Sequence, residues 1–336
     1  MNKIGWLNIP GYKGETWNPI IGCTKVSEGC QNCWAEIMAN RLSGMPHTKE
    51  NYSKVITDGK WNGKTALCFN QLDKPLKWKK PRAIAVCLEG DLFHESVTNS
   101  QINTVFSIMS DCDQHIYILL TKRPDRIVQF YDWKKRNHSI SWQPKNNIWF
   151  GVTVENQEQA NKRIPILLSI PAAKRFVSIE PMLGKVNLNN IAKYNSNGIC
   201  ICYYQVLEPI KNCGDSNRPA LDWVICGGES GSKARPMHPD WVRSLRNQCT
   251  AAEVPFFFKQ WGEYKEGSEF SKTCFNAIVF NDGSYVQDYS TDLDVKLKSM
   301  TREKWNTMHP AVMARVGRKN AGCELDGNTY HEFPKL

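Results

Sequence analysis

The sequence lacks any long apolar run. None of its 336 residues lies in a stretch that approaches the ~20 apolar residues of a membrane helix, and Met1–Lys13 lacks the apolar core of a signal peptide. A composition of 41% hydrophobic and 23% charged residues is ordinary for a globular chain and argues against global disorder. We therefore expect a soluble, cytoplasmic protein with no membrane segment, whose length suits one large domain or two ordinary ones.

Two common nucleotide-binding motifs are also missing. The glycine-rich segment Gly227-Gly-Glu-Ser-Gly231 is not followed by Gly-Lys-Ser/Thr, so it is not a Walker A loop, and it does not match G-x-G-x-x-G. Histidine is scarce at the ends of the strands expected below. This scarcity counts against a metal-dependent hydrolase built on strand-end carboxylates.

Positive charge and cysteine, by contrast, are abundant. The chain has 43 Lys and Arg residues against 33 Asp and Glu, a net charge of +10, which favours polyanionic partners. It also has 13 cysteines, an odd number. In a reducing compartment, clustered cysteines indicate metal ligands or catalytic groups rather than a disulfide framework.

Short unalternated runs of Val, Ile, Leu and Phe predict buried parallel strands. The expected strands are 16–22, 83–88, 115–120, 147–154, 175–179, 223–226 and 255–258, and the expected helices are 34–42, 97–110, 123–136, 156–169 and 239–252. This alternation favours an α/β fold, either a full or partial (β/α) barrel or an open doubly wound sheet. We favour a barrel, which we expect to be partial, because charged residues follow successive strands.

Six charged residues stand just past successive strands. They are Asp91, Lys122, Glu155, Glu180, Glu229 and Lys259. Because the carboxyl ends of parallel strands meet at one face, we expect these side chains to form a polar site there. The alternative is that loops simply begin with charged residues.

Three segments do not follow this alternation of strands and helices. Residues 60–82 carry seven cations against Asp73, with Trp61 and Trp78 between them, which suits a surface that follows phosphates and stacks bases, or a solvated loop. Residues 194–219 look like an insertion. Residues 264–336 are expected to hold a hairpin over 277–286 and a helix over 302–315, so we expect a barrel over 1–262 and a C-terminal appendage over 263–336.

The strongest local signal is Cys23-x6-Cys30-x2-Cys33. Three thiolates satisfy three corners of a tetrahedral metal site, or three irons of a cubane cluster that keeps a fourth position open. An iron–sulfur cluster, a structural zinc with a distant fourth ligand, and unliganded thiols are the three interpretations. Cys200, Cys202 and Cys213 are candidates for a second metal site or for an insertion without metal, and the remaining cysteines are expected to be small core residues.

The string Thr16-Trp-Asn-Pro-Ile-Ile-Gly-Cys-Thr-Lys-Val-Ser-Glu-Gly-Cys-Gln-Asn-Cys33 resembles an uncharacterised family of phage and bacterial proteins. Members of that family are similar to radical S-adenosylmethionine (SAM) enzymes. The resemblance continues through most of the chain, at Asp91-Leu-Phe-His94, Leu120-Thr-Lys-Arg-Pro124, Gly151-Val-Thr-Val-Glu155, Ser178-Ile-Glu-Pro-Met-Leu-Gly184, Gly227-Gly-Glu-Ser-Gly231, Ala234-Arg-Pro236, Phe257-Phe-Lys-Gln-Trp-Gly262, Val316-Gly-Arg-Lys-Asn-Ala-Gly322 and Leu325-Asp-Gly327.

The resemblance implies that Cys23, Cys30 and Cys33 hold a 4Fe-4S cluster whose free iron binds SAM. Reductive cleavage of SAM would then give a 5′-deoxyadenosyl radical, with the electron supplied by a donor such as flavodoxin or ferredoxin. Two features depart from the pattern. The usual spacing is C-x3-C-x2-C, and the aromatic residue usually found just before the last cysteine is replaced by Asn32.

Several other residues are candidates for contacts to SAM or substrate. Glu89 or Asp91 could accept from the SAM amine, and Gly227, Gly228 and Glu229 could lie against its adenosine or sulfonium. Lys122, Arg123, Arg235 and Lys259 could bind a carboxylate or phosphate, or pair with Glu155, Glu180 and Glu229. Candidate catalytic residues are His94, Glu180 and Lys259, although a lone histidine such as His94 is more often structural.

The preferred function is therefore a radical-SAM-type redox enzyme acting on an unknown substrate, for which the charge favours a nucleic acid or nucleotide. The alternative is a non-enzymatic nucleic-acid-binding protein in which zinc or a cluster is a structural clip.

Overall fold

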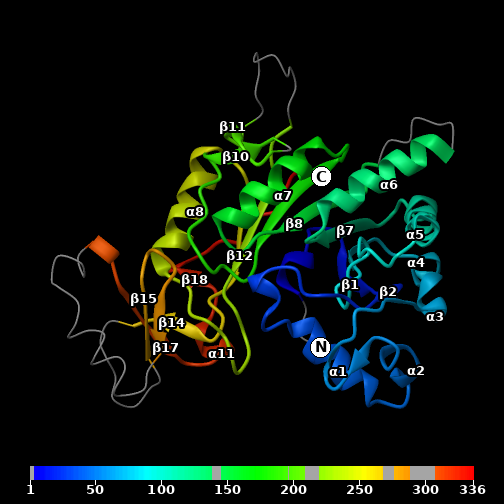
Figure 1. Cartoon of the computed structure of the whole chain (residues 1–336), viewed down its shortest axis with the longest axis horizontal. Coiled ribbons are helices and arrows are strands. Elements are labelled where there is room, and N and C mark those ends of the chain that lie inside the picture. Colours follow the sequence, from blue (N-terminus) through cyan, green and yellow to red (C-terminus); the bar gives the residue numbers. More distant parts are fainter. Residues whose placement is uncertain (1–3, 138–144, 196, 209–218, 268–275, 288–306) are drawn as a thin grey trace. The chain divides into compact units, whose positions relative to one another are not determined.

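The computed structural model describes the chain except residues 1–3, 138–144, 196, 209–218, 268–275 and 288–306 (Figure 1). The chain divides into two compact units. Unit 1 comprises residues 1–153, 162–178 and 209–223, and unit 2 comprises residues 154–161, 179–208 and 224–336. The predicted boundary after residue 262 stays a prediction.

The principal sheet has seven strands, and their order in the sheet follows their order in the chain. The order is β1 (Lys13–Trp17), β6 (Arg82–Val86), β7 (Ile116–Thr121), β8 (Ile148–Thr153), β9 (Lys174–Ile179), β12 (Trp223–Gly227) and β13 (Phe256–Gln260). The pairs with a described register, such as Leu119 opposite Phe150, are all parallel. Strands β6, β8 and β12 are almost wholly buried, which explains their unalternated apolar sequences.

Five longer helices alternate with these strands (Figure 1). They are α1 (Trp34–Ser43), α5 (Asn99–Asp111), α6 (Pro124–Asn137), α7 (Gln157–Ser169) and α8 (Pro239–Ala251). Helix α5 begins at a capping box, in which the Thr98 hydroxyl accepts from the Gln101 amide and the Gln101 side chain accepts from the Thr98 amide. Helix α6 begins at Pro124, so Lys122 and Arg123 occupy the connection after β7, as predicted.

Short elements complete each unit. In unit 1 they are η1 (Gly5–Leu7), β2 (Ile20–Ile21), η2 (Glu28–Cys30), α2 (Lys49–Tyr52), β3 (Ile56–Thr57), β4 (Lys60–Trp61), β5 (Ala66–Leu67), α3 (Phe69–Leu72) and α4 (Lys74–Lys77). In unit 2 they are β10 (Ile191–Tyr194), β11 (Cys200–Tyr204), β14 (Tyr264–Glu266), β15 (Asn276–Val279), β16 (Tyr285–Gln287), β17 (Ala311–Arg315), α11 (Arg318–Ala321), β18 (Glu324–Leu325) and β19 (Asn328–Thr329).

The predicted α/β class is confirmed, because the protein is a mixed α/β protein whose parallel sheet and helices are consistent with a partial (β/α) barrel. The radical-SAM type of this barrel stays a prediction. The predicted hairpin over 277–286 is confirmed as β15 and β16. The helix predicted over 302–315 is wrong at its end, because residues 311–315 form strand β17 between β14 and β15. Met313 is fully buried there, so pairing on both sides overrides the helical propensity of this short run. Residues 302–306 lie outside the described part of the chain.

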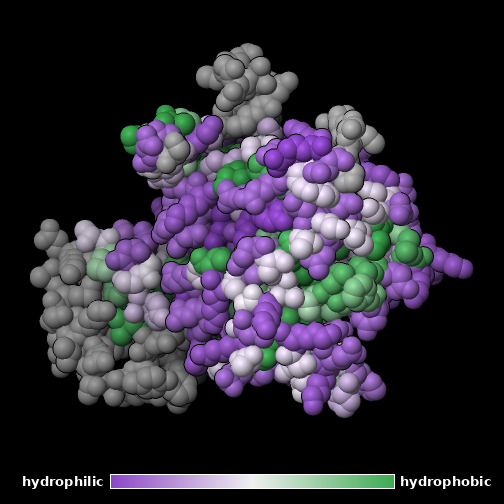
Figure 2. Space-filling view, turned by 45° about the vertical axis from the view of Figure 1, so that its right-hand side comes forward, coloured by the Kyte–Doolittle hydropathy of each residue, from purple (hydrophilic) through white to green (hydrophobic). Residues whose placement is uncertain are grey.

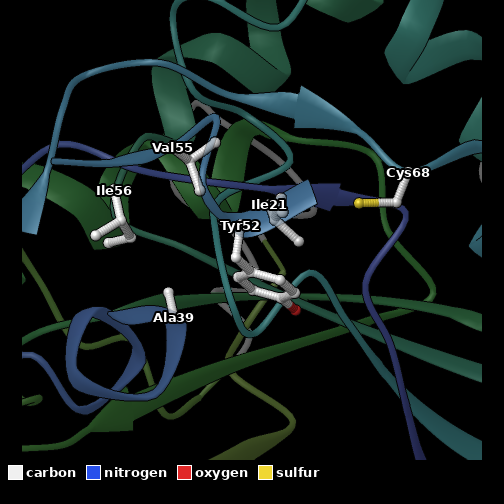
Figure 3. Packing of buried hydrophobic residues seen from close by; sticks show 6 residues of the cluster. All are labelled: Ile21, Ala39, Tyr52, Val55, Ile56 and Cys68. Atoms are coloured by element: carbon white, nitrogen blue, oxygen red, sulfur yellow. The ribbon is translucent and has the colours of Figure 1, made fainter. Parts of the chain in front are cut away.

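Cysteine is mostly a core residue in this protein, as predicted. Cys68, Cys87, Cys112, Cys226 and Cys249 are all buried, whereas Cys323, also expected in the core, is only partly buried. Cys68 belongs to a cluster with Ile21, Ala39, Tyr52, Val55 and Ile56 (Figure 3). Strand β2 packs into this cluster through Ile21, which is fully buried. Cys274 and Cys213 lie outside the described residues.

No helix in the described part of the chain is long and apolar enough to cross a membrane, in agreement with the sequence.

Gly151 in the middle of β8 leaves room for an aromatic ring. A Cβ atom at this position would stand 2.2 Å from the Phe176 ring, which packs 5.9 Å from the Trp223 ring. We expect Gly151→Ala to lower the free energy of unfolding by about 1–3 kcal/mol, because the ring must move within a close-packed core. Chemical denaturation measures the loss. Gly44→Ala is the control for the loss of glycine, because Gly44 has a φ of −90° and a Cβ there would lie 3.6 Å from its nearest neighbour, the Arg41 carbonyl oxygen.

Candidate functional site

The three clustered cysteines lie on one loop between β2 and α1, which we call the cysteine loop (residues 22–33). The loop leaves the sheet at the carboxyl end of β1, where Gly22 forms a parallel bridge to Gly90 beyond the end of β6. Gly22 has a φ of +93°, and a Cβ there would lie 2.3 Å from the Lys64 carbonyl oxygen. Only glycine fits this position without strain, so the backbone places Cys23 at the carboxyl edge of the sheet.

Cys23 is held against a buried ion pair. Arg123 Nη1 lies 3.5 Å from Cys23 Sγ and 3.0 Å from Asp91 Oδ2. Burial, with the Asp91 carboxylate adding to it, raises the pKa of Cys23 to about 12, while Arg123 acts in the opposite direction. The metal-free side chain is therefore a thiol at neutral pH, and binding of a metal there would release a proton.

The other two thiols lie farther along the same loop. Cys33 is close enough to Cys23 to raise its pKa, and it stands directly before α1. Cys30 is buried, with its Sγ 3.9 Å from Ser27 Oγ. In the described ranges no group of three or more His, Cys, Asp or Glu side chains already has the arrangement of a metal site. Three soft thiol donors on one short loop nevertheless suit an iron–sulfur cluster or zinc in their chemistry.

Arg123 joins the cysteine loop to the ends of β6 and β7. Besides Cys23 and Asp91, its guanidinium donates to the Thr24 carbonyl oxygen at 3.2 Å, to Thr24 Oγ1 at 2.6 Å and to Glu95 Oε2 at 3.1 Å. Only 11% of its side chain is exposed. A guanidinium with contacts to two carboxylates and one loop is a positioning group, because its donors are already engaged.

Asp91 and His94 complete this polar cluster. The Thr121 hydroxyl donates to Asp91 at 2.8 Å, and the Phe93 amide donates to Asp91 Oδ1 at 2.9 Å. His94 Nε2 lies 3.0 Å from Thr24 Oγ1, and its Nδ1 lies 2.9 Å from Ser96 Oγ. Burial, aided by Arg123, lowers the pKa of His94, so the imidazole is neutral at pH 7. We call Cys23, Thr24, Asp91, His94, Glu95, Thr121 and Arg123 the Arg123 cluster.

Glu89 stands beside this cluster and has a separate partner. Its carboxylate accepts from the Tyr52 hydroxyl, which lies at the edge of the core group of Figure 3. Burial raises the pKa of Glu89, against the opposing effects of Tyr52 and Lys74. Glu89 and Asp91 therefore differ: Asp91 accepts from the charged Arg123 and from Thr121, whereas Glu89 accepts from the neutral Tyr52 hydroxyl. Lys122, also predicted for the site, is partly buried in the connection after β7.

Unit 2 contains the remaining candidates. Lys259 Nζ lies 2.8 Å from Glu180 Oε1, so the last strand-end cation pairs with a strand-end carboxylate. Glu155 is fully buried, and its carbonyl oxygen accepts from the Leu183 amide at 2.8 Å. Glu180 directly follows β9 and Glu155 lies just beyond the end of β8, as predicted, whereas Lys259 lies inside β13 and not after it.

The glycine-rich segment of unit 2 makes close contacts to protein atoms. A Cβ at Gly227 would stand 2.9 Å from Glu180 Oε1, and one at Gly228 would stand 2.0 Å from the Trp261 carbonyl oxygen. Glu229 forms a bidentate pair with Arg235, at 2.7 and 2.8 Å, and both side chains are buried. Arg235 and Lys259 therefore pair with carboxylates of the protein, which was one of the two alternatives predicted for the strand-end cations.

Sequence reasoning missed the neutral members of the site. Thr24 directly follows Cys23, and Thr121 is the last residue of β7, so the sequence places both residues next to residues predicted for the site. Tyr52 carried none, because its contact to Glu89 spans 37 residues of chain. Cys200 and Cys202 lie on β11, where Cys200 Sγ lies 3.7 Å from the Cys202 carbonyl oxygen.

Comparison with known proteins gives one match. No curated protein and no solved structure matches the chain. The family described as "Protein of unknown function (DUF5131)" matches residues 3–334, which is nearly the whole chain and includes the cysteine loop and the strand ends of both units. The protein therefore belongs to the DUF5131 family.

Proposed function

We propose that the protein is an iron–sulfur enzyme of the radical-SAM type. The observation that carries this proposal is the position of the cysteine loop. Its three thiols follow the first parallel strand of an α/β sheet, and Cys23 lies against the Arg123–Asp91 pair at the ends of β6 and β7. Catalytic groups of parallel α/β folds gather at this edge.

Cys23, Cys30 and Cys33 would hold a 4Fe-4S cluster, which when bound would supply the electron for reductive cleavage of SAM. Arg123 would donate to Cys23 Sγ and fix Thr24, so that the loop keeps one conformation. Glu89 is the better acceptor for the SAM amine, because Asp91 already accepts from Arg123 and Thr121. Gly227, Gly228, Glu180 and Lys259 remain predicted contacts of SAM or substrate.

Iron and sulfide analysis of anaerobically purified protein tests this proposal. We expect about four irons per chain and broad absorption near ~410 nm. Single Cys23→Ser, Cys30→Ser and Cys33→Ser variants should each lose most of the iron. Cys200→Ser/Cys202→Ser is the matched control and should keep it. Colourless protein with one zinc per chain would overturn the cluster assignment.

A second assay separates catalysis from structure. Loaded protein mixed with SAM and dithionite should release 5′-deoxyadenosine. A fully loaded cluster that releases none would favour the second candidate, a non-enzymatic nucleic-acid-binding protein with a structural metal clip. The observation that favours this candidate is the long first spacer of the cysteine motif together with the net charge of +10.

A further inference from the structure

The basic segment 60–82 lies in unit 1 and exposes many of its side chains. It contains β4, β5, α3 and α4, and it then leads into β6. Its exposed side chains are mostly cationic or apolar, and Figure 2 shows apolar surface lying among hydrophilic surface on the face that it brings forward. We call Lys60, Lys64, Phe69, Leu76, Lys79 and Lys80 the basic strip.

The cations of segment 60–82 fall into two groups. Arg82 pairs with Glu15 and covers the Trp78 ring, and Lys77 pairs with Asp73. Lys74 acts electrostatically on Glu89. The four lysines of the basic strip are exposed and form no ion pair with any described residue. Their charges are therefore available to a polyanion, whose bound counterions they would displace.

Phe69 offers an aromatic face beside these charges. Its residue is 77% exposed, the largest value among the large apolar residues of the described chain. The backbone under it is anchored, because the Cys68 amide donates to the Pro19 carbonyl oxygen at 2.8 Å and Trp17 Nε1 donates to the Gln71 carbonyl oxygen at 2.7 Å. An exposed ring on an anchored backbone is a ready platform for stacking a base.

The basic strip also begins next to the candidate site. The Lys64 carbonyl oxygen packs against Gly22, the residue before Cys23, and β5 pairs with β2. Thr65 Oγ1 lies 2.7 Å from Ser96 Oγ, which in turn contacts His94. A chain bound along the strip would thus reach the cysteine loop without leaving unit 1.

We infer that the basic strip binds single-stranded nucleic acid, with a base on Phe69 and phosphates on Lys64, Lys79 and Lys80. This inference rests on the proposed function and names its substrate class. A single strand fits better than a duplex, because bases inside a duplex are already stacked and cannot cover Phe69.

Fluorescence anisotropy with a labelled oligothymidylate of about 20 nucleotides tests the inference on the full-length protein. We expect Lys79→Gln/Lys80→Gln to weaken binding roughly 10-fold at low salt and to reduce the slope of log K against log salt by about 1.4, the value for two single-strand phosphates. Lys265→Gln/Lys319→Gln removes the same charge from exposed positions of unit 2 and should change neither quantity.

The aromatic contribution is tested separately. We expect Phe69→Ala to weaken binding about 5- to 150-fold while leaving the salt slope unchanged. Phe69→Trp should restore affinity, and Ile201→Ala, at an exposed position of unit 2, is the control for loss of exposed apolar surface. Equal affinity for duplex of the same length, or full retention of binding in Phe69→Ala, would overturn the inference. Iron-loaded protein that releases 5′-deoxyadenosine but binds no oligonucleotide would overturn the strip alone and leave the proposed chemistry standing.

Discussion

Glu229→Ala is expected to lower the free energy of unfolding by about 3–5 kcal/mol, because it leaves a buried guanidinium without its counter-charge. In the native protein Arg235 donates to both Glu229 oxygens, through Nε at 2.8 Å and Nη2 at 2.7 Å, and its backbone amide donates to Glu229 Oε2 at 2.8 Å. All three donors lose their acceptor together. Urea denaturation followed by circular dichroism measures the loss.

Two variants show whether the charge is the cause. Glu229→Leu/Arg235→Met removes both charges and should recover more than half of the lost stability. Asp240→Asn breaks the pair of Asp240 with Arg243, in which 60% of the aspartate side chain is exposed, and should cost less than about 1 kcal/mol. If the double variant is no more stable than Glu229→Ala, shape rather than charge controls this site.

Arg123→Met is expected to destabilise unit 1 by about 3 kcal/mol and to release the cysteine loop. The change leaves the Asp91 carboxylate, whose side chain is only 6% exposed, with neutral donors alone, and it removes both bonds from the guanidinium to Thr24. Mass-spectrometric mapping of alkylated peptides should show faster modification of Cys23, because burial is the largest cause of its raised pKa and loss of the cover outweighs loss of the guanidinium, which lowers that pKa. Denaturant unfolding measures the stability.

Arg123→Lys separates charge from geometry. A lysine keeps the positive charge near Asp91 but cannot reproduce the planar fork that reaches Asp91, Thr24 and Glu95 at once. We expect Arg123→Lys to recover most of the stability that Arg123→Met loses. Its Cys23 should still be alkylated faster than in the unchanged protein. Arg126→Met removes a neighbouring guanidinium that donates to the Val97 carbonyl oxygen and serves as the matched control. Unchanged alkylation of Cys23 in Arg123→Met would show that the loop holds its conformation without the guanidinium.

Six of the seven strands of the sheet could be predicted from the sequence, because each is a short apolar run that needs no distant information. Strand β1 (Lys13–Trp17) has no such run, and the first strand was expected at residues 16–22. Residues 147–154, for example, were expected as a strand, and β8 occupies Ile148–Thr153. Residues 311–315 were expected as helix, and they form β17 because β14 and β15 pair with them from both sides. Such pairing depends on partners 32–38 residues away in β15 and 47–51 residues away in β14, which a local pattern cannot contain.

The candidate site was predictable in its cysteines and in charged members such as Asp91 and Arg123, because their residue types point to chemistry, whereas Glu95 was missed. The contacts between them were not predictable. Glu180 and Lys259, for example, were each assigned by their place after a strand, whereas their 2.8 Å pair required the register of the fold. Neutral members such as Thr121 and Tyr52 escaped attention, since hydroxyl side chains occur throughout the chain and only the fold brings these two to carboxylates.

The contacts of the cysteine loop also constrain the order of events during synthesis. Thr24 is bonded to His94, 70 residues downstream, and Cys23 to Arg123, 100 residues downstream. A ribosome adds about 5–20 residues per second, so roughly 5–20 seconds pass between synthesis of Cys23 and synthesis of Arg123, the most distant of these contacts. Until then its thiols are exposed to metal ions and oxidants of the cell. If the loop holds the proposed metal centre, its delivery to the finished site belongs after β7 and Arg123 have been made, and agents that capture thiols earlier would compete with assembly.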